Sequence, residues 1–344
     1  MPKQDFVIER FDPSAERSYE QQFTAEYEAG QTVLDCLNNI KWTQDGSLSY
    51  RWSCRHAICG SCAMKVNGRS MLACKTQVTD IVQRGDPIRI APMGNQKVVK
   101  DLVVDISNFV EAFERAETWL QAIPDQDPPA REYRTDKDEF DRWSHTATCI
   151  HCGACYSDCT VVAVDPKFLG PAALAKAYRF VFDSRDSNKR ERLEFLSEQH
   201  GVWDCTRCFM CIEACPKDVL PMDAIMELRT EAMKMGITNN HGSRHSNAFR
   251  GGVRKRGRLD EATLPILSAG FRPGAIPELM GYTPGALRLL KTRKLLMAAK
   301  RHGASKEGRK QIRRIFDEVD AEKAHDAVDA EAFAAERDSA LMAH

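Results

Sequence analysis

The sequence predicts an α+β protein in which a small mixed domain is followed by helices. Three observations support this fold class: short alternating apolar segments before residue 100, helical apolar periodicity after it, and cysteine-rich loops in both parts. The changes in pattern predict three regions, at residues 1–99, 100–236 and 237–344.

The first region reads as a short sheet with one helix. Residues 5–11 and 20–27 alternate enough to be strands, 32–40 have the apolar spacing of a short helix, and 87–93 form another strand. Asn67-Gly68 lies between two further strand-like pieces and predicts a hairpin.

The second region is predicted to be helical, and its cysteines lie in loops between helices. A Pro-rich stretch, 123–132, separates the first two helices. The predicted helices cover 105–122, 136–146, 172–184, 190–199 and 222–236.

The third region has a different composition. Residues 239–258 are polar and basic, which indicates a linker or an extended arm. Residues 284–316 look helical, and from Arg288 to Arg314 there are eleven Lys and Arg against one acid, Glu307. The Ala- and acid-rich end of the chain is expected to be helical or disordered.

Overall charge and apolar content exclude several classes of protein. Lys plus Arg and Asp plus Glu number 49 each, so the balance gives no reason to expect nucleic-acid binding. The first twenty residues are polar and resemble no secretory signal, and no run approaches the ~20 apolar residues of a transmembrane helix. We expect an intracellular protein, soluble or peripheral on a membrane.

Cysteine is the residue type that gives the most information about function. Of thirteen cysteines, Cys36 lies in the predicted helix 32–40 and is interpreted as a small buried hydrophobe. Clusters in a chain without a secretory signal favour metal binding over disulfides. The other twelve form three groups of four: Cys54, Cys59, Cys62 and Cys74; Cys149, Cys152, Cys155 and Cys159; and Cys205, Cys208, Cys211 and Cys215.

The first group has the spacing C-x4-C-x2-C-x11-C, and its first three cysteines match the plant-type [2Fe–2S] pattern. Two irons with bridging sulfides need four thiolates, which this group supplies. Ala57, Gly60 and Ser61 are small, so backbone N–H groups can approach the sulfurs. Zinc is the alternative, although zinc sites favour paired C-x2-C knuckles.

The second and third groups each read C-x2-C-x2-C-x3-C, and Pro216 follows the later one. In two-cluster ferredoxins three cysteines of such a run bind one cubane and the fourth binds the other. The pattern therefore assigns one [4Fe–4S] cluster to Cys149, Cys152, Cys155 and Cys215, and places Cys205, Cys208, Cys211 and Cys159 around the other. A zinc or purely structural role is the alternative.

Three clusters in one chain indicate an electron-transfer pathway that passes single electrons from a two-electron donor to a distant acceptor. The chain shows no nucleotide-binding glycine motif and no obvious acid/base constellation. We therefore expect a partner protein to carry out the two-electron chemistry.

Segments 53–76, 149–159, 165–186 and 208–225 together resemble the iron–sulfur subunit of succinate dehydrogenase and fumarate reductase, over roughly residues 5–235. The resemblance implies a plant-ferredoxin-like β-grasp domain at 1–99 and a bacterial-ferredoxin-like helical domain at 100–236. It also implies a flavoprotein partner with covalent FAD that oxidises succinate, and a membrane anchor where quinone is reduced. The chain itself would be peripheral, on the cytoplasmic face of the membrane.

This sequence departs from the family pattern at the third cluster. The resemblance implies a [3Fe–4S] cluster held by Cys159, Cys205 and Cys211, with an apolar residue at the position of Cys208. A thiolate there could hold a fourth iron, so we predict a second [4Fe–4S] cluster of lower potential. The alternative is a bystander Cys208 beside a [3Fe–4S] cluster.

A second departure concerns quinone. The family has Pro, Trp and His where this chain has Thr160, Val164 and Thr206, which puts the usual quinone pocket in doubt. Segments 257–270, 286–296 and 309–316 resemble the tails of iron–sulfur subunits that work with cysteine-rich, heterodisulfide-reductase-like partners. Electrons would then reach such a partner first and quinone only indirectly.

Two further features have more than one interpretation. The basic segment 288–314 is either a solvated helical face or a docking site for anionic lipid or an acidic partner. His56, His145 and His151 lie near cluster cysteines. Because each cluster already has four cysteines, we interpret these histidines as outer or surface residues.

The leading functional hypothesis is the electron-transfer subunit of a succinate:quinone oxidoreductase. Fumarate reduction is an alternative, because cluster potentials and the quinone set the direction. Another class is the electron-transfer subunit of a different flavoprotein complex, such as a glycolate or heterodisulfide-type enzyme. The remaining class is a zinc-stabilised scaffold.

Overall fold

The computed structural model describes residues 1–82, 85–122, 134–259, 261, 263–270, 272, 274–293 and 304–321. The chain divides into two compact units, Met1–Ile237 and Thr238–His344. Among the described residues, every helix is too short or too polar to span a lipid bilayer. The boundaries of the three regions that the sequence predicts, 1–99, 100–236 and 237–344, stay predictions.

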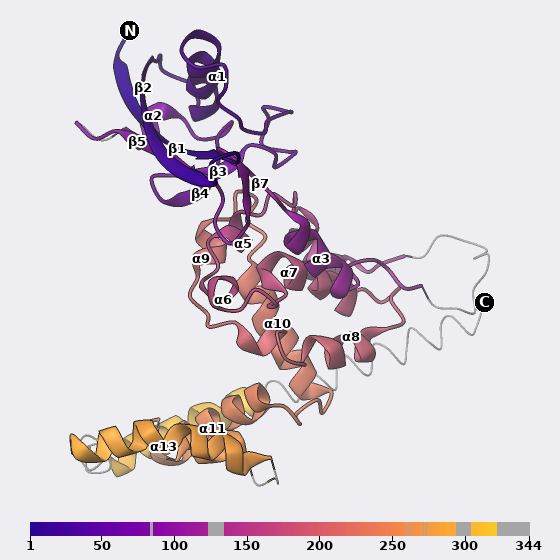
Figure 1. The fold of residues 1–344 in the computed structure, drawn as a ribbon. Coiled ribbons are helices and arrows are strands. Elements are labelled where there is room, and N and C mark those ends of the chain that lie inside the picture. The colour runs from indigo at the N-terminus through magenta and orange to yellow at the C-terminus, as the bar shows by residue number, and fades with distance from the viewer. Residues whose placement is uncertain are drawn as a thin grey trace. The chain divides into compact units, whose positions relative to one another are not determined.

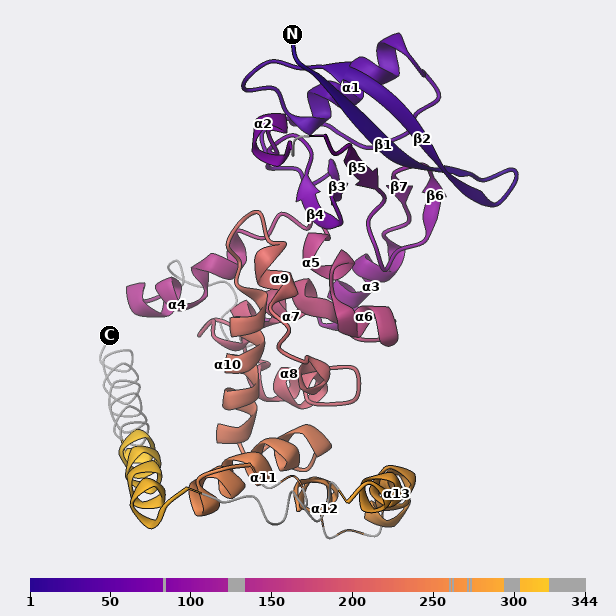
Figure 2. The same ribbon diagram turned by 90° about the vertical axis from the view of Figure 1, so that its left-hand side faces the viewer.

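A five-stranded mixed sheet forms the N-terminal part of the first unit (Figures 1 and 2). Strand order is β2-β1-β5-β3-β4, with β1 antiparallel to β2 and parallel to β5. The strands are β1 (Lys3–Asp12), β2 (Arg17–Glu26), β3 (Ala63–Val66), β4 (Arg69–Leu72) and β5 (Ile88–Ala91). A separate pair, β6 (Val98–Lys100) and β7 (Val103–Val104), follows the sheet.

Alternation along β1 sets the core of this part. Phe6 and Ile8 point inward and are fully buried, with exposed or half-buried residues between them. Helix α1 (Val33–Thr43) packs its apolar face into the same core, and a capping box between Thr32 and Asp35 fixes where it begins. Helix α2 (Val78–Ile81) is a single turn.

The predicted hairpin is confirmed. Strands β3 and β4 pair antiparallel, with Val66 opposite Arg69. Asn67 and Gly68 both have positive φ, 49° and 81°, which suits the two-residue turn that this pair of residues favours. The turn places β4 so that the chain continues directly to Cys74.

Helix α7 (Gly170–Val181) is the centre of the helical part, and almost every residue of it is buried. Figure 2 labels the other α-helices of this part. They are α3 (Ser107–Arg115), α4 (Lys137–Ala147), α5 (Ala154–Ser157), α6 (Thr160–Val164), α8 (Lys189–Leu196), α9 (Met210–Glu213) and α10 (Pro221–Lys234), and the 3-10 turn η1 (Val202–Asp204) precedes α9. Together with the mixed sheet, they confirm the α+β class.

One predicted helix is shorter than expected. The sequence predicts a helix over 105–122, but α3 ends at Arg115. Glu117 adopts a left-handed φ of 47°, and the Thr118 hydroxyl donates to the Phe113 carbonyl, so the chain turns away. The Pro-rich stretch 123–132 lies outside the described residues.

The segment after α7 is held by buried ion pairs. Asp183 accepts two hydrogen bonds from the Arg185 side chain, at 2.6 and 2.7 Å. Asp186 pairs with Arg192 at 2.9 Å, and both side chains are almost fully buried. Arg192 also donates to the carbonyls of Glu117 and Trp119. These contacts tie α8 to the end of α3.

A set of polar contacts, here called the polar clasp, joins the sheet to the helical part. It consists of Ser70, Gly94, Asn95, Ser157 and Asp158. The Ser70 N–H and hydroxyl donate to Asp158 at 3.0 and 2.6 Å, and the Gly94 N–H donates to the Ser157 hydroxyl at 2.8 Å. The Asn95 amide donates to the carbonyls of Tyr156, Ser157 and Cys159 at 2.8–3.0 Å.

The second unit is built from helices, and the expectation of a linker at 239–258 is wrong. Helix α11 (His241–Arg256) occupies that segment. Asn240 caps it by accepting from the Ser243 N–H, and Gly257 ends it in the left-handed conformation. Two of the cations in this segment, Arg250 and Arg254, form ion pairs with Asp317 and Asp320.

The remaining helices of this unit are α12 (Leu264–Ala269), α13 (Ala275–Lys291) and a helix over 306–321. The helical prediction for 284–316 is therefore confirmed over two stretches, and 294–303 lie outside the described residues. The acid-rich end of the chain is described only as far as residue 321.

Asn95→Ala should weaken the polar clasp. The substitution removes the donor for three carbonyls and leaves alanine at a left-handed φ of 59°. We expect the melting temperature of the cluster-loaded protein to fall by about 4–8 °C. The control is Asn108→Ala on the exposed face of α3, which should change it by about 2 °C or less. Equal melting temperatures for both variants would contradict the role of the clasp.

Candidate functional site

The loop before β3 brings the first two cysteines of the first group together. The Cys54 sulfur accepts hydrogen bonds from the backbone N–H groups of His56 and Cys59, each at 3.3 Å. These hydrogen bonds, led by that of His56, lower the pKa of Cys54 to about 6. Arg55 and Ala57 have positive φ, a conformation that turns successive N–H groups toward the sulfur.

Of the other two cysteines of this group, Cys62 is buried and Cys74 is half-buried. Burial, together with the neighbouring thiols of Cys74 and Cys59, raises the pKa of Cys62 to about 12. The structure thus gathers all four cysteines of the first group. Because burial raises its pKa, the Cys62 thiol would ionise more readily beside a positive centre.

The second and third groups share one backbone conformation. In each run the second and fourth residues after the first cysteine have positive φ: His151 and Gly153 in one, Arg207 and Phe209 in the other. A short helix follows each loop, α5 in one and α9 in the other. Phe209 is unusual, because a bulky side chain is strained at a φ of 66°.

One cavity lies between the two runs on the side nearer the sheet. Its empty volume, which includes space open to solvent, is about 360 Å³. Apolar and small residues such as Phe109 and Ala172 form much of the wall. The cysteines that line it are Cys149, Cys152, Cys155 and Cys215, which combine three members of the second group with the last member of the third.

A second cavity has the reciprocal set of cysteines. Its empty volume is about 320 Å³, and Phe168, Met222 and Ile225 contribute apolar walls. The cysteines that line it are Cys159, Cys205, Cys208 and Cys211. The exchange of the fourth cysteine between the runs is therefore present in the folded chain.

Burial of these thiols tests whether a cluster fits. Burial raises the pKa of Cys152 to about 11 and of Cys211 to about 12, and each is raised further by neighbouring cysteines. Without a metal, the buried thiols of Cys152 and Cys211 would stay protonated at neutral pH. A cationic iron centre would stabilise the thiolates, so the donor set and the cavities fit cubane clusters.

Cys208 differs from the other three cysteines of the second cavity because it is exposed and hydrogen bonds stabilise its thiolate. Burial opposes the effect, but the Met210 N–H and the hydroxyls of Thr160 and Thr206 lower its pKa. The Thr160 oxygen lies 3.7 Å from the Cys208 sulfur. From the sequence, both threonines could be identified only as departures from a family pattern. Their contact with Cys208 is visible only in the folded chain.

A buried cation lies behind the second cavity. Arg229 of α10 is 6 % exposed, and its guanidinium donates to the carbonyls of Val202 and Cys205 at 2.8 and 2.6 Å. Burial lowers its pKa to about 10, and the nearby Cys205 opposes that shift. The fold therefore places a positive charge beside a cysteine that the sequence assigns to the third cluster.

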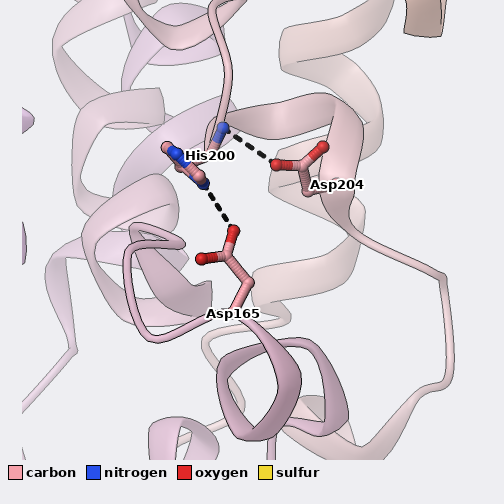
Figure 3. A group of neighbouring side chains, drawn as sticks. All are labelled: Asp165, His200 and Asp204. Carbon is pink, nitrogen blue, oxygen red and sulfur yellow. Dashed lines mark hydrogen bonds and ion pairs between the residues drawn. The ribbon is translucent and has the colours of Figure 1, made fainter. Parts of the chain in front are cut away.

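His200 connects the two stretches that lead into this cavity (Figure 3). The Nδ1 atom of its ring lies 2.5 Å from an Asp165 carboxylate oxygen, just after α6, and the backbone N–H of His200 donates to Asp204 in η1 at 2.8 Å. An imidazole with two carboxylates can bind a divalent cation, and these ligand atoms lie within 4.8 Å of one another. The hydrogen bonds account for the arrangement without a metal.

The three histidines named from sequence have different surroundings. His56 is exposed and contributes its backbone N–H to Cys54. His151 lines the first cavity with its ring against Phe113, and burial lowers its pKa. The His145 ring lies 5.9 Å from that of Tyr178. Cys36 is buried in α1, as its apolar setting indicated.

The loop of the first cysteine group touches the second group directly. A Cβ added to Gly60 would lie 2.8 Å from the Cys152 Cα and 3.1 Å from the Ile150 carbonyl oxygen. Gly60 also has a φ of +71°. Only glycine allows this approach, which brings the first group of cysteines next to the first cavity.

Comparison with known proteins matches both halves of the first unit. Residues 5–111 match the family described as 2Fe-2S iron-sulfur cluster binding domain. Residues 145–219 match the family described as 4Fe-4S dicluster domain. Each matched segment contains the cysteines that the sequence assigned to that kind of cluster, Cys54–Cys74 in one and Cys149–Cys215 in the other.

Curated relatives cover most of the same region. The chain is 41 % identical over 232 residues to a fumarate reductase iron-sulfur subunit of Mycobacterium tuberculosis, covering 65 % of this chain and 91 % of that one. It is 36 % identical to the 8-methylmenaquinol:fumarate reductase iron-sulfur subunit of Wolinella succinogenes (77 % and 84 %). It is 33 % identical to a succinate dehydrogenase iron-sulfur subunit of Coxiella burnetii (67 % and 97 %).

A solved structure supports the fold. A chain of the Mycobacterium smegmatis Sdh1 complex in its apo form superposes with a TM-score of 0.62 at 24 % identity. The match covers 69 % of this chain and 98 % of the other.

Gly60→Ala should disturb the contact between the first two cysteine groups. The new methyl group would force the Cys152 backbone to move, so we expect a loss of iron on purification and an altered spectrum of the [2Fe–2S] cluster. The matched control is Gly68→Ala, which has a similar φ of +81° but no atom within 4 Å of the new methyl.

Gly68→Ala should cost about 1 kcal/mol of stability from backbone strain and keep the full iron content. Iron content by metal analysis and visible absorption are the measurements. If Gly60→Ala kept as much iron as Gly68→Ala, with the same spectrum, the contact would not matter for cluster binding.

Proposed function

Because the chain belongs to the family of iron–sulfur subunits of succinate dehydrogenase and fumarate reductase, we propose that it connects a flavoprotein to a quinone-linked acceptor as their electron-transfer subunit. Members of this family carry a [2Fe–2S] cluster, a [4Fe–4S] cluster and a third cluster. When bound, such clusters accept and release single electrons. The proposal concerns which residues hold them, which partners are joined and which way electrons run.

The reciprocal grouping of cysteines around two cavities is the observation that carries this proposal. We assign Cys54, Cys59, Cys62 and Cys74 to the [2Fe–2S] cluster. The cavity lined by Cys149, Cys152, Cys155 and Cys215 suits the [4Fe–4S] cluster. The cavity lined by Cys159, Cys205, Cys208 and Cys211 suits the third cluster.

For the third cluster we propose the [4Fe–4S] form, with a [3Fe–4S] cluster as the alternative. Cys208 lines the same cavity as the other three cysteines, and hydrogen bonds lower the pKa of its thiol. Thr160 and Thr206, which stand where the family resemblance implies Pro and His, supply two of these hydrogen bonds. Two departures from the family pattern, Thr160 and Thr206, thus act on the sulfur atom that the third, Cys208, supplies.

The exposed ends of this arrangement suit docking of two partners. At the first group, Cys59 and the apolar side chain of Ile58 are exposed, and the Arg55 guanidinium lies 4.6 Å from the Trp52 ring. At the third group, Cys208 and Phe209 are exposed. The cysteines of the first cavity, which lies between these two exposed ends, are half-buried or buried.

We place an FAD-containing subunit at the first end and an anchor or cysteine-rich subunit at the second. Succinate oxidation with indirect reduction of quinone is the direction we favour, and fumarate reduction is the alternative. The chain would then sit peripherally on the cytoplasmic side of a membrane. A role in another flavoprotein complex would keep the clusters and change the substrate. A zinc scaffold would not require an exposed cysteine at each end.

The test is purification of the native complex under anaerobic conditions, followed by addition of succinate or fumarate. The proposal expects a co-purifying flavoprotein, an EPR signal of reduced [2Fe–2S] after succinate is added, and its loss after fumarate is added. Reduction by dithionite but not by succinate would assign the chain to another flavoprotein complex. A colourless protein that contains zinc would overturn the proposal altogether.

Cys208→Ala tests the third cluster. If Cys208 holds the fourth iron, the variant should contain one iron fewer per chain and, when oxidised, give the EPR signal of a [3Fe–4S] cluster that the unmodified protein lacks. The matched control is Cys36→Ala in α1, which should keep the iron content and the silent oxidised spectrum. Identical iron content in Cys208→Ala and unmodified protein would make Cys208 a bystander.

A further inference from the structure

Among the residues of the second unit whose burial the structure describes, no large apolar side chain is fully buried. Across its described residues, 238–259, 261, 263–270, 272, 274–293 and 304–321, the buried residues are Ser243, Ser268, Ala269 and Ala275. Such small side chains contribute little apolar area to a core. The large apolar residues of this unit therefore remain available to a surface that covers them.

Helix α13 carries the largest share of this exposed apolar surface. Ile276, Met280, Leu287 and Leu290 are 65, 67, 54 and 47 % exposed. Their spacing of four, seven and three residues places them on one face of a helix with 3.6 residues per turn. Leu279, which is half-buried, lies on the same face.

One polar side chain, that of Thr283, lies within this apolar stripe. Its hydroxyl oxygen lies 3.5 Å from the Leu279 carbonyl, to which it can donate. The opposite side of the helix presents Gly281 and Gly285, where an added side chain would meet no atom within 4 Å. The same side also carries Arg288 and the exposed Leu289, so it is mixed in character, whereas the stripe is mainly apolar.

Positive charge accompanies the stripe. Arg288, Lys291 and Arg293 lie at the C-terminal end of α13, and no acidic residue occurs in the sequence between Glu278 and Glu307. Lys294, Lys300 and Arg301 continue the basic run in sequence. An apolar face bordered by cations matches the interface of an anionic bilayer, where acyl chains cover the apolar side chains and headgroups meet the charges.

We propose that α13 is an interfacial helix that lies on the surface of an anionic lipid bilayer through the stripe Ile276, Met280, Leu287 and Leu290. A bilayer is favoured over a protein groove because the Thr283 hydroxyl, the polar group of the stripe, can donate within its own helix, while the basic border of the stripe complements anionic headgroups. The helix has 17 residues and lies on the membrane rather than across it. The inference concerns the second unit and does not depend on the electron-transfer proposal.

The test uses the full cluster-loaded chain and flotation with two kinds of vesicle. One kind contains phosphatidylcholine with about 30 % phosphatidylglycerol, and the other contains phosphatidylcholine alone. The chain should float with the anionic vesicles, and added salt should weaken that binding. Met280→Glu with Leu287→Glu should lower the partition coefficient at least about tenfold, because two carboxylates would enter the apolar layer.

The matched control adds the same charge to the other face. Gly281→Glu with Gly285→Glu should bind anionic vesicles to within about threefold of the unmodified chain, since only Coulomb repulsion from the headgroups is added. Retained helical circular dichroism and iron content in both double variants show that folding is intact. The iron content also separates this test from the electron-transfer proposal, which vesicle binding does not measure.

Three results would overturn the inference. The first is no flotation of the unmodified chain with anionic vesicles. The second is an equal loss of binding in both double variants. The third is self-association of the chain in analytical ultracentrifugation that Met280→Glu with Leu287→Glu abolishes while vesicle binding stays absent, which would make the stripe an interface between copies.

Discussion

The approach of the first cysteine loop to the second cysteine run is the constraint on which the first unit depends. Gly60 lies so near Cys152 that no other residue fits there, and the polar clasp holds the sheet and the helical part in that position. Asn95 is central because one side-chain amide binds three carbonyls in and after α5, including that of Cys159. The same contacts therefore fix the position of the first cysteine group relative to both cavities.

Electrostatics explains why these loops have their unusual backbones. Buried thiols close to one another resist ionisation, as the raised pKa values of Cys62 and Cys211 show. Positive φ angles turn backbone N–H groups toward the sulfurs, and bound iron would supply the missing positive charge. Cys208 receives additional hydrogen bonds from two threonine hydroxyls, which is the arrangement expected for a thiolate ligand at a solvent-exposed position.

Sequence reasoning predicted the features that depend on local spacing. The α+β class, the hairpin at Asn67-Gly68 and the kinds of cluster are confirmed, because turn chemistry and cysteine intervals specify them. The assignment of individual ligands stays a prediction. The clasp was missed, because Asn95 and Cys159 are 64 residues apart and an asparagine in a loop carries no signal of its partner. Helix α11 was mistaken for a linker because two of its cations, Arg250 and Arg254, find their partners Asp317 and Asp320 far along the chain.

The central claim is that the fold holds the [2Fe–2S] site against the first cubane site. The most direct measurement is EPR power saturation of the reduced [2Fe–2S] signal in the purified protein, recorded once with the [4Fe–4S] cluster oxidised and once with it reduced. Contact between the two loops predicts that reducing the [4Fe–4S] cluster makes the [2Fe–2S] signal relax faster and saturate at higher microwave power. The same saturation in both redox states would contradict the account, because it would mean that the two sites are too far apart to interact.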